Sequence, residues 1–383
     1  MLTFALQLKN NIVANFSQLG VSSNYIKSIK DLNIIEPTPV QVEVIPFLLK
    51  NNSDVVVQAQ TGTGKTAAFG LPILQKINPT SDKVQALILT PTRELGQQIA
   101  KQLFKFTKYN TDKIFTEAVY GGEHISKQLS RLDRTTHILV ATPGRLIDLI
   151  QRKVVNLDSV KTVVLDEADE MLNMGFKKEL ETILSQLPER RNTWLFSATI
   201  PKEVRAIISN YLNKDAHAFQ LSKDDVVNKN IEHQFVVVRE HDKLDMLIQF
   251  LKSNGNARGV VFCTTKKMAI TLSKQLQSKN YNCEALQGDM QQKERDKVMR
   301  GIKNKSLQIL VSTDVAARGI DIDGLNYVVH FDVPAQLEFY THRSGRTARG
   351  GKKGIAISFV TNQEIVKLRA IERDLGIRIS QLR

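Results

Sequence analysis

Ala59-Gln60-Thr61-Gly62-Thr63-Gly64-Lys65-Thr66 is the stretch that decides how this chain is interpreted. It follows the apolar run Val55-Val56-Val57 and precedes a segment that is compatible with a helix. A strand, a glycine-rich turn and a helix start form a phosphate cradle, because backbone N–H groups and the helix N-terminus face the anion. Ala59 stands where the strict pattern has Gly, so the rest of the chain has to decide.

The residue types in this turn suit a nucleoside triphosphate. We expect the backbone of Thr61, Gly62, Thr63 and Gly64 to surround the phosphates. Lys65 would reach the β- and γ-phosphates, and the Thr66 hydroxyl would hold Mg²⁺. The turn therefore predicts ATP-type binding with a magnesium ion.

Acidic residues follow a second apolar run about one hundred residues later. Val163-Val164-Leu165 leads into Asp166-Glu167-Ala168-Asp169. An acidic tetrad alone is usually a solvated loop, but after a phosphate cradle it indicates catalysis. Asp166 would hold the metal through water, and Glu167 would orient and deprotonate the attacking water.

Length and charge restrict the class of protein. A chain of 383 residues is long enough for two ordinary domains. Residues 1–215 hold 26 Lys and Arg against 21 Asp and Glu, and residues 216–383 hold 27 against 18. Both halves are basic, which favours a polyanion partner such as a nucleic acid. Charge alone leaves open a basic surface that is simply solvated.

Targeting and cysteine patterns indicate a cytoplasmic protein. Cys263 and Cys283 are the two cysteines, too few for a zinc site or a disulfide framework, and Cys263 lies in an apolar run. No apolar run approaches the ~18 residues of a membrane span. We see no secretory signal and expect no membrane contact.

Short apolar runs alternate with amphipathic helical patterns, which predicts an α/β fold with mostly parallel sheets flanked by helices. The rhythm restarts after a polar stretch, so we expect domains at 1–215 and 231–383 joined by a linker at 216–230. The predicted strands are Val55–Gln58, Ala86–Thr90, Ile114–Val119, His137–Ala141, Thr162–Leu165, Trp194–Ser197, Glu232–Val238, Gly259–Cys263, Tyr281–Ala285, Gln308–Ser312, Tyr327–Phe331 and Gly354–Phe359.

The ordered set of motifs resembles the DEAD-box ATP-dependent RNA helicases of helicase superfamily 2. The tetrad at 166–169 spells the family name, and the resemblance runs from Phe16 to about Phe359. It implies two tandem RecA-like domains with ATP and Mg²⁺ in the cleft. It also implies that Gln41 of Pro37-Thr38-Pro39-Val40-Gln41 bonds the adenine edge and that Phe16 stacks on the base.

The resemblance assigns further roles in both domains. Coupling of hydrolysis to strand separation falls to Ser197, Thr199, His342 and Arg343, the arginine fingers are Arg346 and Arg349, and Asp321 contacts the ATP ribose. Arg343, Arg346 and Arg349 recur every third residue, which on a helix puts them along one face. The RNA contacts implied are Pro91, Thr92, Arg93, Gly121, Gly122, Thr142, Pro143, Gly144, Arg145, Gln292, Arg295, Thr313, Arg318 and Gly319.

These assignments lead to one expected activity and two rivals. We expect RNA-stimulated ATP hydrolysis coupled to local, non-processive unwinding of short RNA duplexes or remodelling of RNA–protein complexes. RNA would bind through its backbone, without sequence preference, to a monomer that takes a protein cofactor or RNP partner. A DNA helicase and an ATP-gated RNA clamp with slow hydrolysis remain alternatives.

Some positions depart from the family pattern. Asn33 stands where Gly is usual, and Asn tolerates a left-handed turn. Ala348 replaces a common Gly in the finger motif, which puts its fine geometry in doubt. Little sequence follows a helix predicted over Gln363–Leu375, so we expect this to be a helicase core from a longer protein. The alternative is a naturally minimal enzyme that relies on a partner for targeting.

Overall fold

A computed structural model describes residues 15–60, 62–189, 191–221, 229–317, 324–334, 337–348 and 352–382. The chain divides into two compact units, Met1–Leu221 and Ser222–Arg383.

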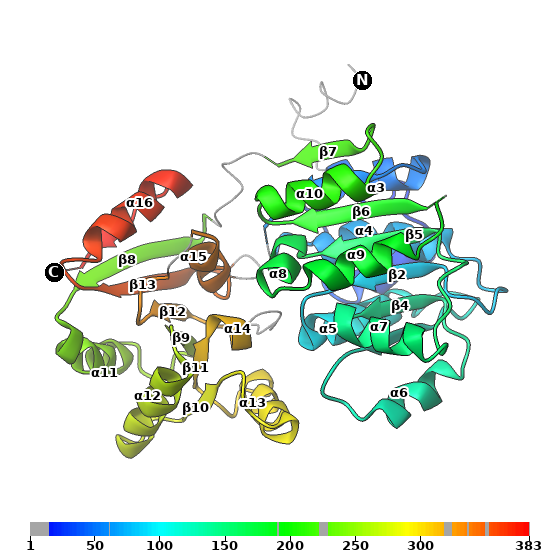
Figure 1. Ribbon diagram of the computed structural model, residues 1–383. Coiled ribbons are helices and arrows are strands. Elements are labelled where there is room, and N and C mark those ends of the chain that lie inside the picture. Colours follow the sequence, from blue (N-terminus) through cyan, green and yellow to red (C-terminus); the bar gives the residue numbers. More distant parts are fainter. Residues whose placement is uncertain are drawn as a thin grey trace. The chain divides into compact units, whose positions relative to one another are not determined.

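The first unit is built on a parallel sheet with the strand order β3-β4-β2-β5-β6-β1-β7 (Figure 1). Its central strands are buried along their whole length, as expected for a parallel sheet with both faces covered. The strands are β1 (Val55–Gln58), β2 (Ala86–Leu89), β3 (Thr116–Val119), β4 (Ile138–Ala141), β5 (Thr162–Asp166), β6 (Asn192–Ser197) and β7 (His217–Gln220).

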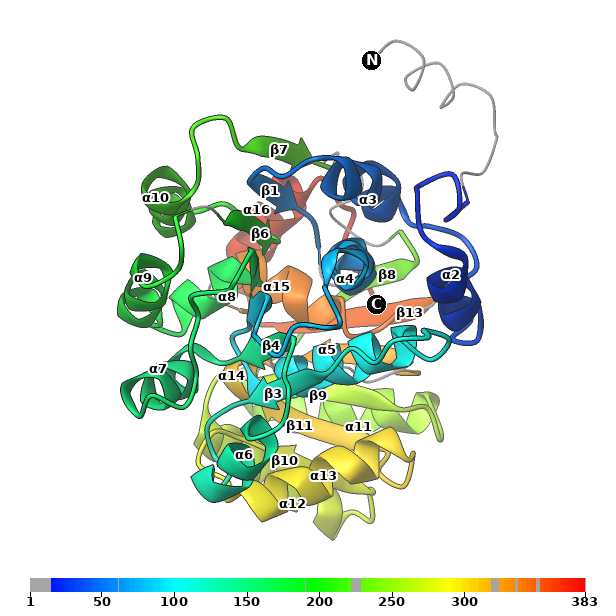
Figure 2. The ribbon, with the colours of Figure 1, turned by 90° about the vertical axis from the view of Figure 1, so that its right-hand side faces the viewer.

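Helices cover both faces of this sheet, and each face has its own hydrophobic cluster (Figure 2). One face carries α2 (Ser23–Lys30), α3 (Pro39–Lys50), α4 (Lys65–Lys76) and α5 (Arg93–Phe106). The other carries α7 (Pro143–Gln151), α8 (Ala168–Asn173), α9 (Lys177–Ser185) and α10 (Lys202–Tyr211), and the short α6 (Ile125–Leu132) adds apolar side chains at its margin.

The second unit is also built on a parallel sheet, with the order β10-β11-β9-β12-β13-β8-β14. Its strands are β8 (Ile231–Val237), β9 (Gly259–Cys263), β10 (Cys283–Leu286), β11 (Ile309–Thr313), β12 (Tyr327–His330), β13 (Gly354–Val360) and β14 (Ser380–Gln381). One face packs against α11 (Lys243–Ser253) and α12 (Lys266–Ser278). The other packs against α13 (Gln292–Lys303), α14 (Asp314–Ala317), α15 (Leu337–Ser344) and α16 (Ile365–Leu375). A 3₁₀ turn, η2 (Glu240–Asp242), precedes α11.

The two sheets have the same topology. When the strands of each unit are numbered from its first strand, both sheets have the order 3-4-2-5-6-1-7. The α/β fold class with two parallel, helix-flanked sheets is confirmed. The twelve predicted strands are all present, with ends that shift by up to two residues.

Two strands were not predicted, and both lie at sheet edges. β7 pairs with β1 through residues 217–220, so part of the stretch predicted as a linker belongs to the first sheet. β14 has two residues and pairs with β8. Within the described residues, no helix combines the length and apolar character that crossing a bilayer requires.

Candidate nucleotide and RNA sites

Apart from Phe16 and the Gln41 motif, the predicted motifs of the first unit follow the carboxyl ends of its strands. This is the edge where open α/β sheets bind ligands. The phosphate turn follows β1, and the acidic tetrad begins at the last residue of β5. The Ser197-Ala198-Thr199 motif begins at the last residue of β6. The Ala59 N–H donates to the Ser197 carbonyl at 2.9 Å, so two of these turns are joined directly.

The phosphate turn has the backbone that the sequence predicts. Gly62 and Gly64 have φ of +83° and +92°, in the left-handed region that L side chains rarely adopt. A Cβ at Gly62 would meet no atom within 4 Å, so the space above it is open. Lys65 begins α4, and its ammonium is buried and donates to the Ala59 carbonyl at 2.8 Å. Thr61 lies outside the described residues.

Gln41 is placed beside the phosphate turn. Its Oε1 accepts from the Thr38 N–H at 3.0 Å, and its Nε2 donates to the Gly64 carbonyl at 3.0 Å. A Cβ at Gly64 would come within 2.4 Å of this Nε2, so only glycine allows the approach. Gln41 thus ties the start of α3 to the turn. Phe16 is 2% exposed in the core cluster, and it offers almost no ring surface to a base here.

The acids at the end of β5 are buried. Burial raises the pKa of Asp166 to about 7, and the charge of Lys65 opposes this rise. The Glu167 N–H donates to Asp166 Oδ1 at 3.1 Å. Glu167 itself has φ +54° and ψ 52°, a left-handed conformation that is strained for a residue with a side chain. A cation at this point would favour the ionised form of Asp166.

Asp169 is the functional candidate that the sequence analysis missed. Its Oδ2 accepts from the Thr199 N–H at 2.9 Å and from the Thr199 hydroxyl at 2.8 Å, while its own N–H donates to Ser197 Oγ at 3.1 Å. The acidic tetrad and the Ser197–Thr199 motif are therefore one hydrogen-bonded group. The signal was available, because Asp169 is the last acid of the tetrad and a third carboxylate at this strand end needs a partner.

Three turns of the first unit that were predicted to contact RNA also lie at this edge. Thr92 caps α5 by accepting from the Leu95 N–H at 3.3 Å, and Pro143 follows Thr142 at the first position of α7. Pro91 and Arg93 flank the cap at Thr92. The guanidinium of Arg93 lies 5.7 Å from the ring centre of Tyr120, the residue before Gly121.

The glycines of these turns differ in their backbone. Gly122 has φ +83° and needs to be glycine for that reason. Gly121 and Gly144 do not have positive φ, and no atom lies within 4 Å of a Cβ built on either. The described fold does not require glycine at these two positions. The space beside both glycines is open and could hold a bound molecule.

One donor of Arg145 has no acceptor among the described residues. Its Nη2 donates to the Glu123 carbonyl at 3.2 Å, and its Nε lies 3.8 Å from Asp148. Its Nη1 is buried and has no hydrogen-bond partner among the described residues. Such a donor is costly unless a further acceptor arrives.

Arg343 and Arg346 do not share a helix, so for these two residues the prediction of one helix face was wrong. α15 ends at Ser344, just before Gly345, so Arg346 lies in the turn that follows. Arg343 is fully buried and pairs with Asp314 through two hydrogen bonds of 2.5 and 2.7 Å. Arg343 therefore joins α15 to the start of α14, directly after β11. Arg349 lies outside the described residues.

Other predicted residues of the second unit lie on α13, at the end of β11 and on α15. Arg295 Nη2 donates to the Ala316 carbonyl at 2.9 Å, and Gln292 Nε2 donates to Asp296 at 2.6 Å on the same helix. Thr313 is buried at the end of β11, and His342 lies on α15. Arg318, Gly319 and Asp321 lie outside the described residues.

The shared topology reveals a turn that the sequence analysis overlooked. β9 occupies the place in the second sheet that β2 has in the first. It leads to Thr265, whose hydroxyl accepts from the Met268 N–H at 3.1 Å at the start of α12, as Thr92 does at the start of α5. Strand–threonine–helix spacing was the signal that could have found it.

The donor set fits a magnesium ion that is held mainly through water. The described residues contain no cluster of three or more His, Cys, Asp or Glu side chains that could hold a metal. Mg²⁺ usually keeps several waters and takes one or two protein oxygens together with substrate phosphates. The buried Asp166 and the Thr66 hydroxyl at the start of α4 provide that number.

The tandem α/β sheets, with a phosphate turn followed by an acidic strand end, define a RecA-like ATPase of the helicase type. Comparisons with known proteins give the family. The DEAD/DEAH box helicase model matches residues 38–207, and the helicase conserved C-terminal domain model matches residues 242–351. The chain belongs to the DEAD-box ATP-dependent RNA helicases.

Relatives share most of the chain. It is 43% identical over 361 residues to the DEAD-box ATP-dependent RNA helicase CshA of Bacillus cereus, covering 94% of this chain and 68% of that protein. It is 42% identical over 371 residues to CshA of Geobacillus kaustophilus, covering 97% and 79%. Dbp5 of S. cerevisiae bound to RNA and ADP BeF3 superposes with a TM-score of 0.88 at 32% identity, covering 96% and 95%. The protein is thus an ATP-hydrolysing RNA helicase, and neither rival activity is favoured.

Proposed function

We propose that this helicase couples RNA-stimulated ATP hydrolysis to the local opening of short RNA duplexes. The observation that carries the proposal is the Asp169 group. Its hydrogen bonds to Thr199 and Ser197 tie the acids of the nucleotide site to a turn at the same sheet edge as the RNA turns. A movement of the acids when the nucleotide is hydrolysed would be transmitted through these hydrogen bonds to the turns at that edge.

The nucleotide would bind at the turn between β1 and α4. Backbone N–H groups at residues 62–64 face the phosphates, and Lys65 exchanges its 2.8 Å bond to the Ala59 carbonyl for phosphate oxygens. Gln41 touches the turn at Gly64, so it would bond the adenine edge and report base identity to the phosphate turn. Phe16 is 2% exposed, so stacking on adenine would require its ring to leave the core.

Hydrolysis would proceed by in-line attack of water on the γ-phosphorus. Glu167 accepts a proton from the water while the new P–O bond forms and the bond to the β,γ-bridging oxygen breaks, giving ADP and phosphate. The left-handed backbone of Glu167 fixes where its carboxylate points. Mg²⁺, held by Asp166 and Thr66, would supply positive charge at the phosphates.

The RNA would lie along the turns after β2, β3 and β4. Arg93, Gly121, Thr142 and Arg145 would contact phosphates and 2′-hydroxyls, which position a strand without reading its sequence. The open space at Gly121 and Gly144 supports this assignment. So does the buried Nη1 of Arg145, for which the described part of the chain offers no acceptor. In the second unit, Thr265 would contact RNA as Thr92 does in the first. The other RNA contacts proposed for this unit are Gln292, Arg295, Thr313, Arg318 and Gly319.

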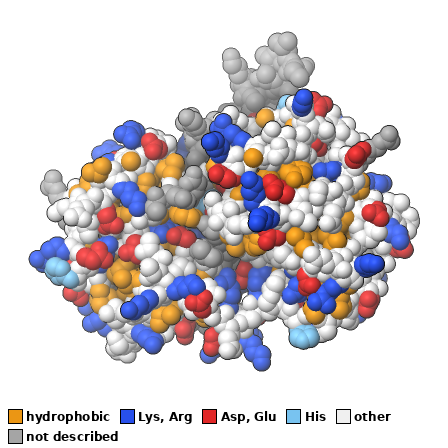
Figure 3. All heavy atoms as spheres, in the orientation of Figure 1, with side chains coloured by type: hydrophobic (Ala, Val, Ile, Leu, Met, Phe, Trp, Pro, Cys, Tyr) orange, Lys and Arg blue, Asp and Glu red, His pale blue; other side chains and the backbone are white. Residues whose placement is uncertain are grey.

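Arg346 and Arg349 would neutralise charge on the γ-phosphate. Asp321 would contact the ATP ribose, and His342 would help to couple hydrolysis to strand separation. For Arg343 we propose support of α14 and α15 in place of direct coupling, because its Nε and Nη2 donate to Asp314 and its Nη1 donates to the Asp332 carbonyl. Basic residues spread over the face of the molecule drawn in Figure 3 are compatible with a sequence-independent polyanion partner. We extend the proposal to a cytoplasmic monomer that recruits a protein or RNP partner, in keeping with two buried, free cysteines.

The test separates ATP turnover from strand separation. Thr199→Ala removes the hydroxyl that donates to Asp169 and keeps the rest of the site. We expect RNA-stimulated turnover to remain within about threefold, whereas unwinding of a short RNA duplex falls by tenfold or more. Thr199→Ser, which keeps the hydroxyl, is the matched control. Equal loss of turnover and unwinding in Thr199→Ala would contradict the coupling role.

A further inference from the structure

The short helix α6 is fastened to the Gly121–Gly122 turn by a buried polar side chain. Gln128, on α6, is fully buried. Its Oε1 accepts from the Tyr120 N–H at 3.3 Å, and its Nε2 donates to the Tyr120 carbonyl at 2.8 Å. The residue before Gly121 is therefore held on both sides of its backbone by one side chain.

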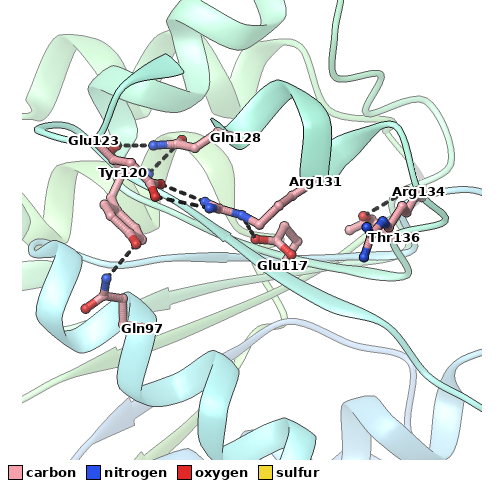
Figure 4. Close-up of polar contacts among 8 residues, drawn as sticks. All are labelled: Gln97, Glu117, Tyr120, Glu123, Gln128, Arg131, Arg134 and Thr136. Atoms are coloured by element: carbon pink, nitrogen blue, oxygen red, sulfur yellow. Dashed lines mark hydrogen bonds and ion pairs between the residues drawn. The ribbon is translucent and has the colours of Figure 1, made fainter. Parts of the chain in front are cut away.

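Arg131, one turn further along α6, holds the other end of the same turn (Figure 4). Its Nη1 and Nη2 donate to the two carboxylate oxygens of Glu123 at 3.1 and 2.7 Å, and its Nε donates to Glu117 on β3 at 2.5 Å. The side chains are one fifth to one third exposed, so water screens the pairs only in part. These hydrogen bonds lower the pKa of Glu123.

The segment between Tyr120 and Glu123 touches the other two RNA turns. The ring of Tyr120 faces Arg93, and its hydroxyl accepts from Gln97 Nε2 at 2.5 Å (Figure 4). The carbonyl of Glu123 accepts from Arg145 Nη2 at 3.2 Å. A shift of this segment would therefore displace contacts to both arginines.

We propose that Arg131 is a positioning residue for RNA binding, which sets the Gly121–Gly122 turn and Arg145 against the RNA backbone by clamping Glu123 and Glu117. The inference rests on the proposed RNA role of those turns. Arg131 also neutralises two carboxylates beside the path of the phosphates. Without it, Glu117 and Glu123 would repel each other and the incoming strand.

The test compares Arg131→Met with Arg134→Met in the full chain. Arg134 follows α6, its side chain is exposed, and its contact in Figure 4 is made by its backbone carbonyl, which accepts from the Thr136 hydroxyl. Both variants lose one positive charge from the same region. We expect Arg131→Met to raise the RNA concentration that half-stimulates ATP turnover by about three- to tenfold, and Arg134→Met by less than about twofold.

Other readouts separate positioning from general destabilisation. The KM for ATP and the turnover at saturating RNA should stay near wild type in Arg131→Met, because the nucleotide turn is untouched. Arg131→Lys keeps the charge but loses the two-pronged contact with Glu123, so it should recover part of the RNA affinity. The proposal would be overturned if Arg131→Met weakened RNA binding, raised the KM for ATP and lowered the melting temperature together.

A double-mutant cycle tells positioning from direct contact. If Arg131 acts through Glu123, Arg131→Met should add little to Glu123→Gln, whereas an Arg131 that touched RNA itself would show its full effect in either background. A full effect in both backgrounds would overturn the proposal. Arg145→Met tests the proposed function separately: if it leaves RNA affinity unchanged, the RNA role of these turns fails, and if it weakens RNA binding while Arg131→Met does not, only the inference fails.

Discussion

Single residues at the nucleotide site are held in conformations that only their surroundings explain. Glu167 adopts φ +54° although it is not glycine, and its neighbours Asp166 and Asp169 are buried. The sequence was enough to place Asp166 and Glu167 at the end of an apolar strand, and their roles in hydrolysis stay predictions. It did not predict the hydrogen bonds of Asp169, because their partners Ser197 and Thr199 come from the end of another strand.

The first prediction concerns the nucleotide site. Lys65→Ala should lower ATP turnover by about 10²-fold or more, because the phosphates lose a fixed counter-charge. Lys76→Ala, at the opposite end of α4, is the matched control and should turn over ATP normally. Steady-state phosphate release measures both. Similar losses in the two variants would remove Lys65 from the site.

The second prediction concerns the proposed general base. Glu167→Gln should keep binding of ATP and RNA but lower single-turnover hydrolysis by about 10²–10⁴-fold, because the amide cannot accept the proton. Nucleotide binding by fluorescence titration and hydrolysis in a rapid quench are measured side by side. Hydrolysis at the wild-type rate would show that another group takes the proton.

The third prediction concerns the open glycines. Gly121→Ala and Gly144→Ala should fold normally, because no atom lies within 4 Å of the added methyl. Each should weaken RNA binding about three- to tenfold by filling the space that the backbone of RNA would use. Gly122→Ala is the contrast, since φ +83° makes it destabilising by about 1 kcal/mol. RNA titrations and thermal melts measure the two effects, and unchanged RNA affinity in both variants would move the RNA path elsewhere.

Elements of the second unit show where sequence patterns stop being informative. The spacing of Arg343, Arg346 and Arg349 suggested one helix face, but α15 ends at Ser344 and Arg343 turns inward to Asp314. A three-residue spacing of arginines does not show where the helix ends. It also does not show that Arg343 pairs with Asp314, a residue far away in the sequence. β7 and β14 were missed for a similar reason, because short edge strands take their pairing from β1 and β8.

Asn33 is a case in which local chemistry sufficed. The sequence predicted that Asn would tolerate the left-handed turn before α3, and its φ of +59° confirms this. Ala348, by contrast, has φ +56° without a polar side chain to compensate. The doubt about the geometry of the finger motif therefore has a structural basis.

The fourth prediction concerns a stack of buried rings between the second sheet and α15. His330 stacks on Tyr340 with ring centres 4.6 Å apart, and His233 Nδ1 lies 3.0 Å from the Tyr340 hydroxyl. Burial lowers the pKa of His233 from 6.5 to about 4, and burial with the charge of Arg343 holds that of His330 well below its usual value. Both shifts favour the neutral imidazole in the folded protein at neutral pH.

The sign of the pH effect follows from these pKa values. Below pH 6.5 the unfolded chain binds protons that the folded chain does not, so the free energy of unfolding falls as pH drops toward 4. The slope should be up to about 1.4 kcal/mol per pH unit for each histidine. Urea unfolding between pH 7 and 5 measures it. His233→Leu should flatten the slope, and an unchanged slope would contradict the assignment.

The whole molecule repeats one topology twice without repeating its sequence. Both sheets have the order 3-4-2-5-6-1-7, yet the phosphate turn and the acidic tetrad occur in the first unit and the arginine motif in the second. The sequence predicted two α/β domains from their rhythm, but topology depends on which strands pair, and short apolar runs do not specify that. The division of chemistry between the units makes their cooperation testable.

The fifth prediction uses that division. Arg346 belongs to the second unit, whereas the phosphate turn belongs to the first. Arg346→Ala should lower RNA-stimulated turnover by about 10²-fold or more, because charge on the γ-phosphate loses a partner in the transition state. ATP affinity should change by less than about threefold. Arg369→Ala, on the surface helix α16, is the control, and equal losses of turnover and ATP affinity would make Arg346 a ground-state contact instead.

The central claim is that ATP turnover is stimulated by an RNA backbone that binds at the carboxyl ends of the strands. The most direct measurement is ATP turnover and strand separation with RNA and DNA of matched sequence, length and salt. We predict strong stimulation by single-stranded RNA, little by single-stranded DNA, and separation of a short RNA duplex that requires ATP, because the proposed contacts include 2′-hydroxyls. Equal stimulation by RNA and DNA, or duplex separation without ATP, would contradict the account.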